Sequence, residues 1–202
     1  MSGEDPVLGA TMVGPLVQGI QKHVMSIAKH YIGNTQETHR QGVNEVIDEQ
    51  TLMELYGPPF AAAAQAGVAG YMCAYNRVNG VYACENHHTL RTMLQGRYNH
   101  TGFVVSDWHA THSTGAAINN GLDIEMPQAM YFAPDKIKAA IAAKNISAAN
   151  VEESCQRILT GYFRVPQDKR DPGPCGGGIC IQRNVSTGQH KVLFQTLSQA
   201  LR

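Results

Sequence analysis

Residues 102–110 read GFVVSDWHA, and this stretch decides how the rest of the chain is interpreted. Its apolar half suits a fully buried strand, because aromatic and β-branched side chains fill both faces of a covered sheet. The apolar run stops at Ser106, and an acid and an indole follow directly. Parallel α/β proteins carry their chemistry just past the carboxyl ends of strands, so Asp107 is a candidate reactive group. On local sequence alone, a helix N-cap is the alternative role for Asp107.

Composition narrows the class of protein. The 202 residues include 16 basic and 16 acidic side chains, so the formal net charge is zero, and 43% of the residues are hydrophobic. This balance argues against a nucleic-acid-binding surface and against a polybasic membrane patch. No apolar run is long enough to span a bilayer, and residues 1–6 lack the basic start and apolar block of a secretory signal. We therefore expect a globular domain that binds neither nucleic acid nor membrane.

Two features favour an oxidising, extracytoplasmic environment. N-x-Ser/Thr sequons, which also arise by chance, begin at Asn99, Asn145 and Asn184. The five cysteines are Cys73, Cys84, Cys155, Cys175 and Cys180. Cys73 and Cys84 flank a turn-rich segment and could form a disulfide bond, while an odd cysteine count leaves one thiol over. We expect a secreted, glycosylated protein whose signal peptide lies upstream of residue 1.

The spacing of apolar residues predicts alternating helices and strands. Helices are expected at residues 8–23, 48–57, 61–66, 90–98, 110–120, 134–141 and 151–162, and strands at 24–32, 68–75, 103–106 and 122–126. Pro58 and Pro59 are expected to interrupt a helix, and Asn79-Gly80 to form a turn. Such alternation predicts βα units on a parallel sheet. Because a (β/α)8 barrel needs eight strands, we expect a partial (β/α)8 TIM-like barrel with parallel strands, with a complete small open sheet as the alternative.

Polar or aromatic residues follow each predicted strand, which predicts a shared site if the strands are parallel. The four groups are Lys29-His30 with Glu37 and Arg40, residues 72–76 (MCAYN), residues 106–108 (SDW), and Asp123 with Glu125, Met126 and Pro127. Nearby cations would favour an ionised Asp107, and Trp108 offers an apolar face of the kind on which sugar rings stack. Taken singly, Met72, Tyr75 and Trp108 are also typical of core packing, and Lys29-His30 of a surface pair.

Several segments together resemble the N-terminal barrel domain of glycoside hydrolase family 3, the β-glucosidase family. They are EDP at residues 4–6, AKHYIGNTQETHR at 28–40, YMCAYNRVNG at 71–80, VSDW at 105–108 and GLDIEMP at 121–127, in the family's order and spacing. The resemblance covers roughly residues 3–166. The reading KHYIGN at residues 29–34 is similar to the glucosidase branch rather than the bacterial hexosaminidase branch. His109 departs from the family, which tends to have a smaller residue there.

The resemblance implies a retaining exo-glycosidase that hydrolyses terminal non-reducing β-D-glucosyl residues, with a β-linked glucoside or oligosaccharide as substrate. Asp107 corresponds to the nucleophile, and the substrate-binding residues implied are Lys29, His30, Arg40, Met72, Tyr75 and Trp108. Alternatives are a β-xylosidase of the same family or an inactive carbohydrate-binding remnant. No metal or other cofactor is implied, and the histidine pairs at 87–88 and 109–112 lack an acidic or cysteine partner at ligand spacing.

The resemblance also implies two domains in the protein to which this chain belongs. Residues 1–166 correspond to the partial barrel, and residues 167–202 to a Gly- and Pro-rich linker followed by the start of a second domain. The family's usual acid/base is a Glu in that second domain, which would complete the site. Retaining hydrolysis needs two carboxyl groups about 5–5.5 Å apart. We therefore expect the 202-residue chain alone to be nearly inactive.

Overall fold

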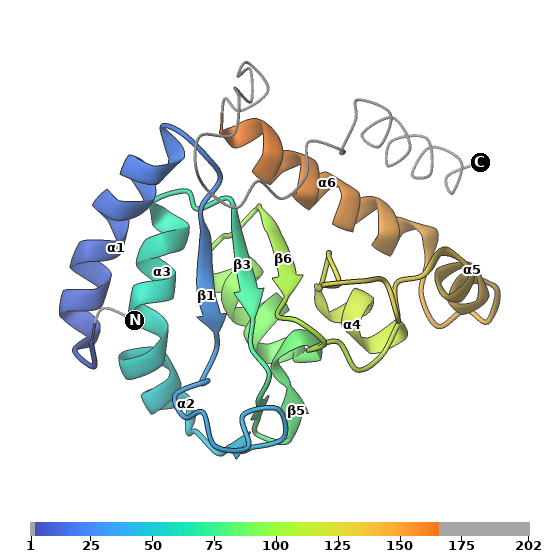
Figure 1. The fold of residues 1–202 in the computed structure, drawn as a ribbon, viewed down its shortest axis with the longest axis horizontal. Coiled ribbons are helices and arrows are strands. Elements are labelled where there is room, and N and C mark those ends of the chain that lie inside the picture. Colours follow the sequence, from blue (N-terminus) through green and yellow to red (C-terminus); the bar gives the residue numbers. More distant parts are fainter. Residues whose placement is uncertain (1–2, 166–202) are drawn as a thin grey trace, which may run out of the picture. The chain divides into compact units, whose positions relative to one another are not determined.

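A computed structural model describes residues 3–165, and the helices, strands and side chains below belong to that range (Figure 1). The first helix, α1 (Pro6–Gln21), begins and ends two residues before the predicted helix at 8–23. The carboxylate of Asp5 accepts hydrogen bonds from the backbone N–H groups of Val7 and Leu8, and Pro6 occupies the first turn. The expected linker at 166–178, the segment beyond it, and Cys175 and Cys180 lie outside the described residues.

A parallel sheet of three strands, β1 (Ile27–Tyr31), β3 (Gly70–Cys73) and β6 (Phe103–Ser106), forms the centre of the domain. The strands lie in chain order, and each is shorter than or equal to its predicted span. The predicted strand at 122–126 is wrong as a strand: only Ile124 bridges to Val105, in parallel. Strands added in order with helices between them are the arrangement of a partial TIM-like barrel, which confirms the predicted fold class.

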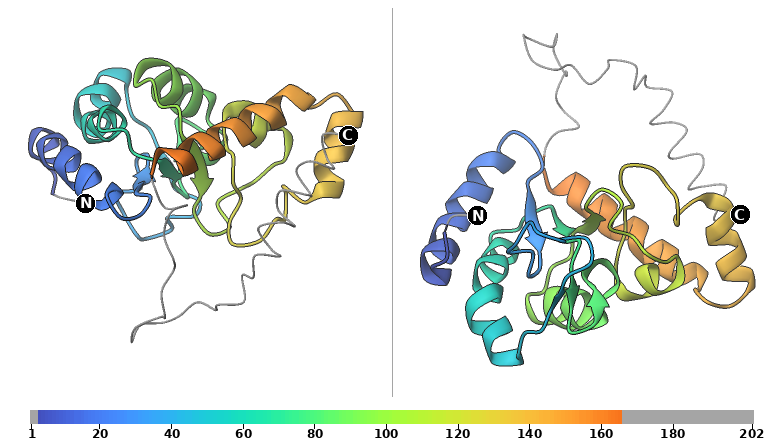
Figure 2. Two further views of the ribbon diagram at one scale, coloured as in Figure 1. Left: turned by 90° about the horizontal axis from the view of Figure 1, so that it is seen from above. Right: turned by 60° about the horizontal axis from the view of Figure 1, so that its bottom comes forward.

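Helices cover the sheet. Figure 1 shows α1 beside α3 (Gly57–Gln65) next to β1, while α6 (Ala148–Arg164) contacts β6 and extends from there toward α5. Both views of Figure 2 keep α1 at one end of the domain and α5 (Pro134–Ala142) at the other. Gly161 allows α6 to approach the sheet, because a Cβ there would lie 2.7 Å from both the Ala69 carbonyl oxygen and the Phe103 ring.

The segment before α3 corrects one prediction. Asp48 caps α2 (Glu49–Thr51) as expected, and the chain continues as a π-helix, η1 (Leu52–Tyr56), directly into α3. Pro58 and Pro59 therefore do not interrupt a helix. They occupy the first turn of α3 directly after the π-helical turn of η1, and the helical segment continues through them.

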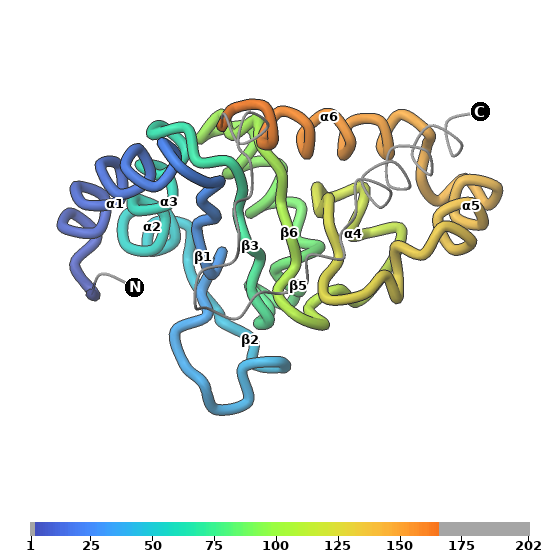
Figure 3. Tube along the Cα trace, turned by 45° about the horizontal axis from the view of Figure 1, so that its top comes forward, coloured from blue at the N-terminus to red at the C-terminus, as the bar shows by residue number. Residues whose placement is uncertain are grey.

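A second, small sheet lies past the carboxyl ends of the main strands. It contains β2 (Asn44–Glu45), β4 (Arg77–Val78) and β5 (Val81–Tyr82), in the order β2-β4-β5. Asn79 and Gly80, with φ angles of 51° and 91°, form the predicted turn between β4 and β5. Figure 3 shows the loop that leads into β2 standing out from the neighbouring chain.

The remaining helices are η2 (Ala83–Glu85), η3 (His88–Arg97) and α4 (Gly115–Asn120). The predicted helix at 110–120 begins at 115, because side chains before that point bond outside the segment. Thr114 Oγ1 donates to the Tyr131 carbonyl at 2.7 Å, and Ser113 Oγ donates to Glu85 at 2.6 Å. Gly121, in the left-handed region at φ 105°, ends α4 as expected.

Candidate active site

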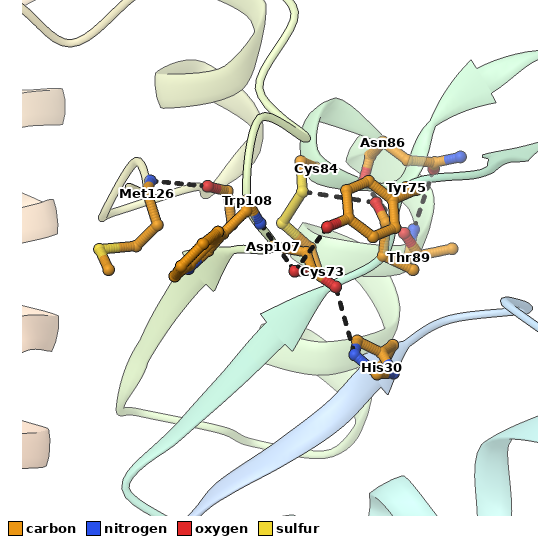
Figure 4. The surroundings of a disulfide bond; sticks show 11 residues. His30, Cys73, Tyr75, Cys84, Asn86, Thr89, Asp107, Trp108 and Met126 are labelled. Carbon is orange, nitrogen blue, oxygen red and sulfur yellow. Dashed lines mark hydrogen bonds and ion pairs between the residues drawn. A yellow bond between two sulfur atoms is a disulfide. The ribbon is translucent and has the colours of Figure 1, made fainter. Parts of the chain in front are cut away.

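Three side chains meet where the three parallel strands end. His30 comes from β1, Tyr75 follows β3 by two residues, and Asp107 follows β6 directly. Figure 4 shows His30 and the Tyr75 hydroxyl pointing toward the Asp107 carboxylate from opposite sides. The parallel pairing of the strands is the reason that residues so distant in sequence share one location.

Asp107 is held at both carboxylate oxygens. Oδ1 accepts hydrogen bonds from the Tyr75 hydroxyl at 2.9 Å and from the backbone N–H of Trp108 at 2.7 Å. Oδ2 lies 3.2 Å from Nε2 of His30. The side chain is 13% exposed, so the carboxylate is fixed in place and still accessible from solvent. A carboxylate held in this way can attack an electrophilic carbon.

A β-bulge brings His30 to this position. Ile27 and Ala28 of β1 oppose Gly70 and Tyr71 of β3, but Tyr31 then opposes Cys73. One extra residue is therefore present in β1 between Ala28 and Tyr31, at Lys29-His30. Such a bulge breaks the two-residue alternation of side chains and re-aims them.

Burial and neighbouring charges set the protonation states around Asp107. Partial burial lowers the pKa of His30, and although Asp107 opposes this shift, Lys29 and Arg40 add to it. Burial, followed by the hydrogen bond to Asp107, raises the pKa of Tyr75. At neutral pH, both Tyr75 and a neutral His30 can therefore donate a hydrogen bond to the carboxylate.

The predicted cations lie near Asp107 in different ways. Lys29 is exposed, and its effect on the site is the electrostatic one on His30. The Arg40 guanidinium stacks over the Tyr75 ring, 4.7 Å from the centroid, and forms an ion pair with Glu37 at 3.0 Å. Arg40 therefore supports the residue that holds Asp107, within the loop between β1 and β2.

The predicted apolar site residues divide into one exposed and one packed side chain. Trp108 is 60% exposed, so it is not a core residue, and Figure 4 shows its ring beside Asp107 and Met126. Met72 is half-buried and packs with the cluster that includes Val105. Core packing therefore describes part of the Met72 side chain but not Trp108.

The fourth predicted group does not contribute its acids to the site. Asp123 points into the protein, where Arg157 of α6 contacts both of its oxygens, the nearest at 2.8 Å from Nη2. The Glu125 carboxylate accepts backbone N–H groups of Tyr131 and Phe132, at 2.8 and 2.7 Å, and so closes the 126–132 loop. Alternation along 122–126 could not show which direction each acid faces.

Two parts of the surroundings carried little signal in the sequence. Cys73 and Cys84 form the disulfide bond that the sequence left open, and it lies next to Tyr75 (Figure 4). The hydroxyl of the buried Ser106 accepts the Met126 backbone N–H at 2.9 Å. Ser106 belonged to the predicted group at residues 106–108, but a serine at the end of an apolar run gives no sign of its bonding partner.

Among residues 3–165, no group of three or more His, Cys, Asp or Glu side chains is arranged to hold a metal ion. No helix there is both long and apolar enough to cross a membrane.

The fold and the site define an α/β barrel-type domain with a fixed carboxylate at the carboxyl ends of its parallel strands. Residues 2–161 match the family described as "Glycosyl hydrolase family 3 N terminal domain". The chain therefore belongs to glycosyl hydrolase family 3.

Individual relatives agree with this assignment. The chain is 36% identical to the "Probable beta-glucosidase L" of Emericella nidulans, in an alignment that covers 96% of this chain and 28% of the relative. It is 34% identical to a β-glucosidase of Pyricularia oryzae, over 94% of this chain and 26% of the relative. Among solved structures, it resembles a β-glucosidase from Chaetomella raphigera, with a TM-score of 0.80 and 40% identity over 84% of this chain and 24% of that one. The chain thus spans about a quarter of the relatives it matches.

Proposed function

We propose that the protein to which this chain belongs hydrolyses terminal β-D-glucosyl residues by a retaining, two-step mechanism with Asp107 as nucleophile. The observation that carries this proposal is the fixed and accessible Asp107 carboxylate, held by Tyr75, His30 and the Trp108 backbone N–H. Family membership and relatives named as β-glucosidases support the choice of β-glucosides as substrate.

In the first step, an Asp107 oxygen attacks the anomeric carbon, and the bond from that carbon to the leaving oxygen breaks. The leaving oxygen takes a proton from an acid, and a glycosyl ester on Asp107 results. In the second step, water attacks the same carbon, gives a proton to the conjugate base of that acid, and releases Asp107. We assign the acid/base role to a carboxyl group outside residues 3–165.

The surrounding residues suit recognition of a sugar. Lys29 can donate hydrogen bonds to sugar hydroxyls, and Nδ1 of a neutral His30, whose Nε2–H faces Asp107, can accept one. The Arg40 guanidinium supports Tyr75 by stacking over its ring. The exposed Trp108 ring offers a stacking face, and Met72, which packs with the cluster that includes Val105, is assigned to the apolar wall of the site. No step requires a metal or other cofactor.

Secretion is part of the same proposal. The Cys73–Cys84 disulfide supports it, because such bonds persist mainly in oxidising compartments. The sequons at Asn99 and Asn145 begin on exposed residues, as acceptors for glycans would.

The nucleophile can be tested independently of the acid/base. The reagent is a 2-deoxy-2-fluoro-β-glucoside that carries dinitrophenolate as its leaving group. Dinitrophenolate departs without protonation, and the fluorine slows hydrolysis of the glycosyl ester, so the intermediate accumulates. The longest natural chain that contains residues 1–202 is treated with this reagent, and peptide mass spectrometry locates the label. We expect release of one equivalent of dinitrophenolate and a label on Asp107.

The matched variants are Asp107→Asn and Asp135→Asn. Asp135 is an exposed acid in the first turn of α5, so its substitution controls for loss of a surface carboxylate. Labelling should be lost in Asp107→Asn and unchanged in Asp135→Asn. A label on another residue, or an unaffected Asp107→Asn, would show that Asp107 is not the nucleophile. The same reagent in the xylose series distinguishes a β-xylosidase, which would label faster with it.

A further inference from the structure

Building on the proposed function, we propose that Glu85 is a positioning residue for Asp107. Its carboxylate joins the loop that follows Asp107 to a turn that the Cys73–Cys84 disulfide holds against β3. Glu85 itself does not touch Asp107; it acts on the loop that carries this residue.

The first link is the end of β3. The backbone N–H of Asp107 donates to the Cys73 carbonyl at 3.1 Å, and Tyr75, two residues further on, donates its hydroxyl to the Asp107 side chain. The end of β3 therefore fixes Asp107 both at its backbone and at its carboxylate.

The second link is covalent. The Cys73 side chain is bonded to Cys84, with the two Cα atoms 5.1 Å apart, and both residues are buried. Cys84 is the middle residue of η2, and Glu85 is the last. The disulfide thus holds η2 against the strand end that supports Asp107.

The third link closes a ring of contacts. Glu85 Oε2 accepts the Ser113 hydroxyl at 2.6 Å, and the Glu85 backbone carbonyl accepts Nδ2 of Asn120 at 2.7 Å. Ser113 lies in the loop that leads from Asp107 to α4. From Asp107 the ring therefore passes through Cys73, Cys84, Glu85 and Ser113 and returns along the chain.

A stacking contact joins the same two loops. The rings of Tyr82 and His112 are nearly parallel, at 17°, with their centroids 3.5 Å apart. Burial lowers the pKa of His112, so its imidazole stacks in the neutral form at pH 7. The adjacent His112 and Ser113 are therefore tied to two positions of the other segment, Tyr82 and Glu85, which restricts rotation of the 107–114 loop as well as its displacement.

Such a ring matters because a nucleophile must be placed accurately. A displacement of about 1 Å at a reacting group can slow a reaction by about a hundredfold. The saturating rate constant for labelling of Asp107 should therefore respond to the ring, whereas the concentration of fluoro-glucoside needed for half-saturation should not.

The test compares Ser113→Ala, Ser113→Thr, Glu85→Ala and the double variant Ser113→Ala/Glu85→Ala. We expect Ser113→Ala and Glu85→Ala to lower the saturating rate constant about tenfold or more, with half-saturation within about twofold of wild type. Ser113→Thr keeps the hydroxyl and should restore the rate. The double variant should be no slower than the slower single variant, because both substitutions break the same link.

One control addresses helix capping. Ser113 Oγ also accepts the Ala117 backbone N–H at 3.3 Å, so its loss could weaken α4. Ser147 caps α6 in a comparable way, accepting the Asn150 backbone N–H at 3.2 Å, and Ser147→Ala should leave labelling unchanged. If Ser147→Ala slows labelling as much as Ser113→Ala does, general loss of stability explains the effect and the proposal is wrong.

Hydrogen exchange provides a readout without substrate. In Glu85→Ala and Ser113→Ala, peptides from residues 107–114 should exchange faster, and peptides from α6 should not. If Glu85→Ala fails to fold, the comparison of Ser113→Ala with Ser113→Thr tests the positioning role by itself. Wild-type labelling at Asp107 with no change in rate or exchange in Ser113→Ala overturns the positioning role only. Absence of wild-type labelling overturns the proposed function, and exchange still tests the ring.

Discussion

Asp107 and Asp123 lie close to the same strand, β6, and differ in what surrounds them. The Asp123 side chain is fully buried, receives a two-nitrogen contact from Arg157 and accepts the Val104 backbone N–H at 2.9 Å. Asp107 is partly exposed, and its partners are a hydroxyl, a backbone N–H and an imidazole with a lowered pKa.

The difference teaches how one fold uses the same residue type for two purposes. A guanidinium that satisfies both oxygens of a carboxylate leaves it little capacity to react, and such a pair joins α6 to the sheet. Neutral donors hold a carboxylate in position without forming a full ion pair with it. Asp123 is thus an anchor, and Asp107 has the environment of a reactive group.

The largest expected effect contrasts the two acids directly. Asp107→Asn should lower the rate of dinitrophenolate release from a β-glucoside by at least about a thousandfold, because the amide cannot form the ester. Its free energy of unfolding should change by less than about 1 kcal/mol. Rates and urea unfolding curves of the same preparation provide both values. A large loss of stability with retained rate would reverse the roles that we assign to the two acids.

The anchor should respond in the opposite way. Arg157→Met leaves the buried Asp123 carboxylate without its cation, and we expect a loss of about 3–5 kcal/mol in the free energy of unfolding. Adding Asp123→Asn should recover part of this loss, because the uncompensated charge is removed. Denaturant titration of the three proteins tests this. A loss below about 1 kcal/mol for Arg157→Met would mean that the pair does not anchor α6.

A third prediction concerns a buried base rather than an acid. Burial lowers the pKa of His100 to about 4, so the folded protein keeps this side chain neutral while the unfolded chain binds a proton below about pH 6.5. The unfolded state then holds more protons between pH 6.5 and 4, and stability falls as the pH falls through this window. The loss should reach roughly 3 kcal/mol.

The variants His100→Gln and His87→Gln test this prediction. His100→Gln removes the titration, so stability should depend less on pH across the window, whatever its absolute value. His87 is exposed, and its substitution should leave the pH dependence unchanged. An unaltered dependence in His100→Gln would assign the loss to other groups.

The smallest effect is expected at the surface. His88 and Glu49 form a pair with 2.8 Å between Nε2 and Oε2, and the side chains are 45% and 59% exposed. His88→Gln should change the free energy of unfolding by less than about 1 kcal/mol, and added salt should reduce even that change. Unfolding at low and high ionic strength measures it. A loss comparable to that in Arg157→Met would show that burial is not what separates the two pairs.

Much of this arrangement follows from local sequence. The abrupt change from apolar to polar at Ser106-Asp107 identified both the strand and the candidate reactive group, because only a covered strand tolerates such a run. Asp48 caps the start of α2 and Gly121 ends α4, as their chemistry predicts. The side on which Asp123 lies depended on Arg157, which is distant in sequence, so no local pattern could distinguish its role from that of Asp107.

The proline pair and the loop after Asp107 show a second limit. Proline usually interrupts a helix, and the sequence does not mark the π-helical turn at Leu52–Tyr56 after which Pro58 and Pro59 continue into α3. Ser113 and Thr114 lie outside the helix because their hydroxyl groups donate hydrogen bonds to Glu85 and to the Tyr131 carbonyl, which are distant in sequence. In the loop after Asp107, tertiary hydrogen bonds therefore decided the local structure.

The extra residue in β1 makes the site depend on chain length as well as on side-chain identity. Deleting Lys29 would restore regular pairing with β3 between Ala28 and Tyr31, while every side chain that touches Asp107 was still encoded. The bulge that aims His30 at Asp107 would then be lost. A single-codon deletion there is therefore expected to be more damaging than most substitutions, and insertions or deletions in this strand should be rare among working descendants of this gene.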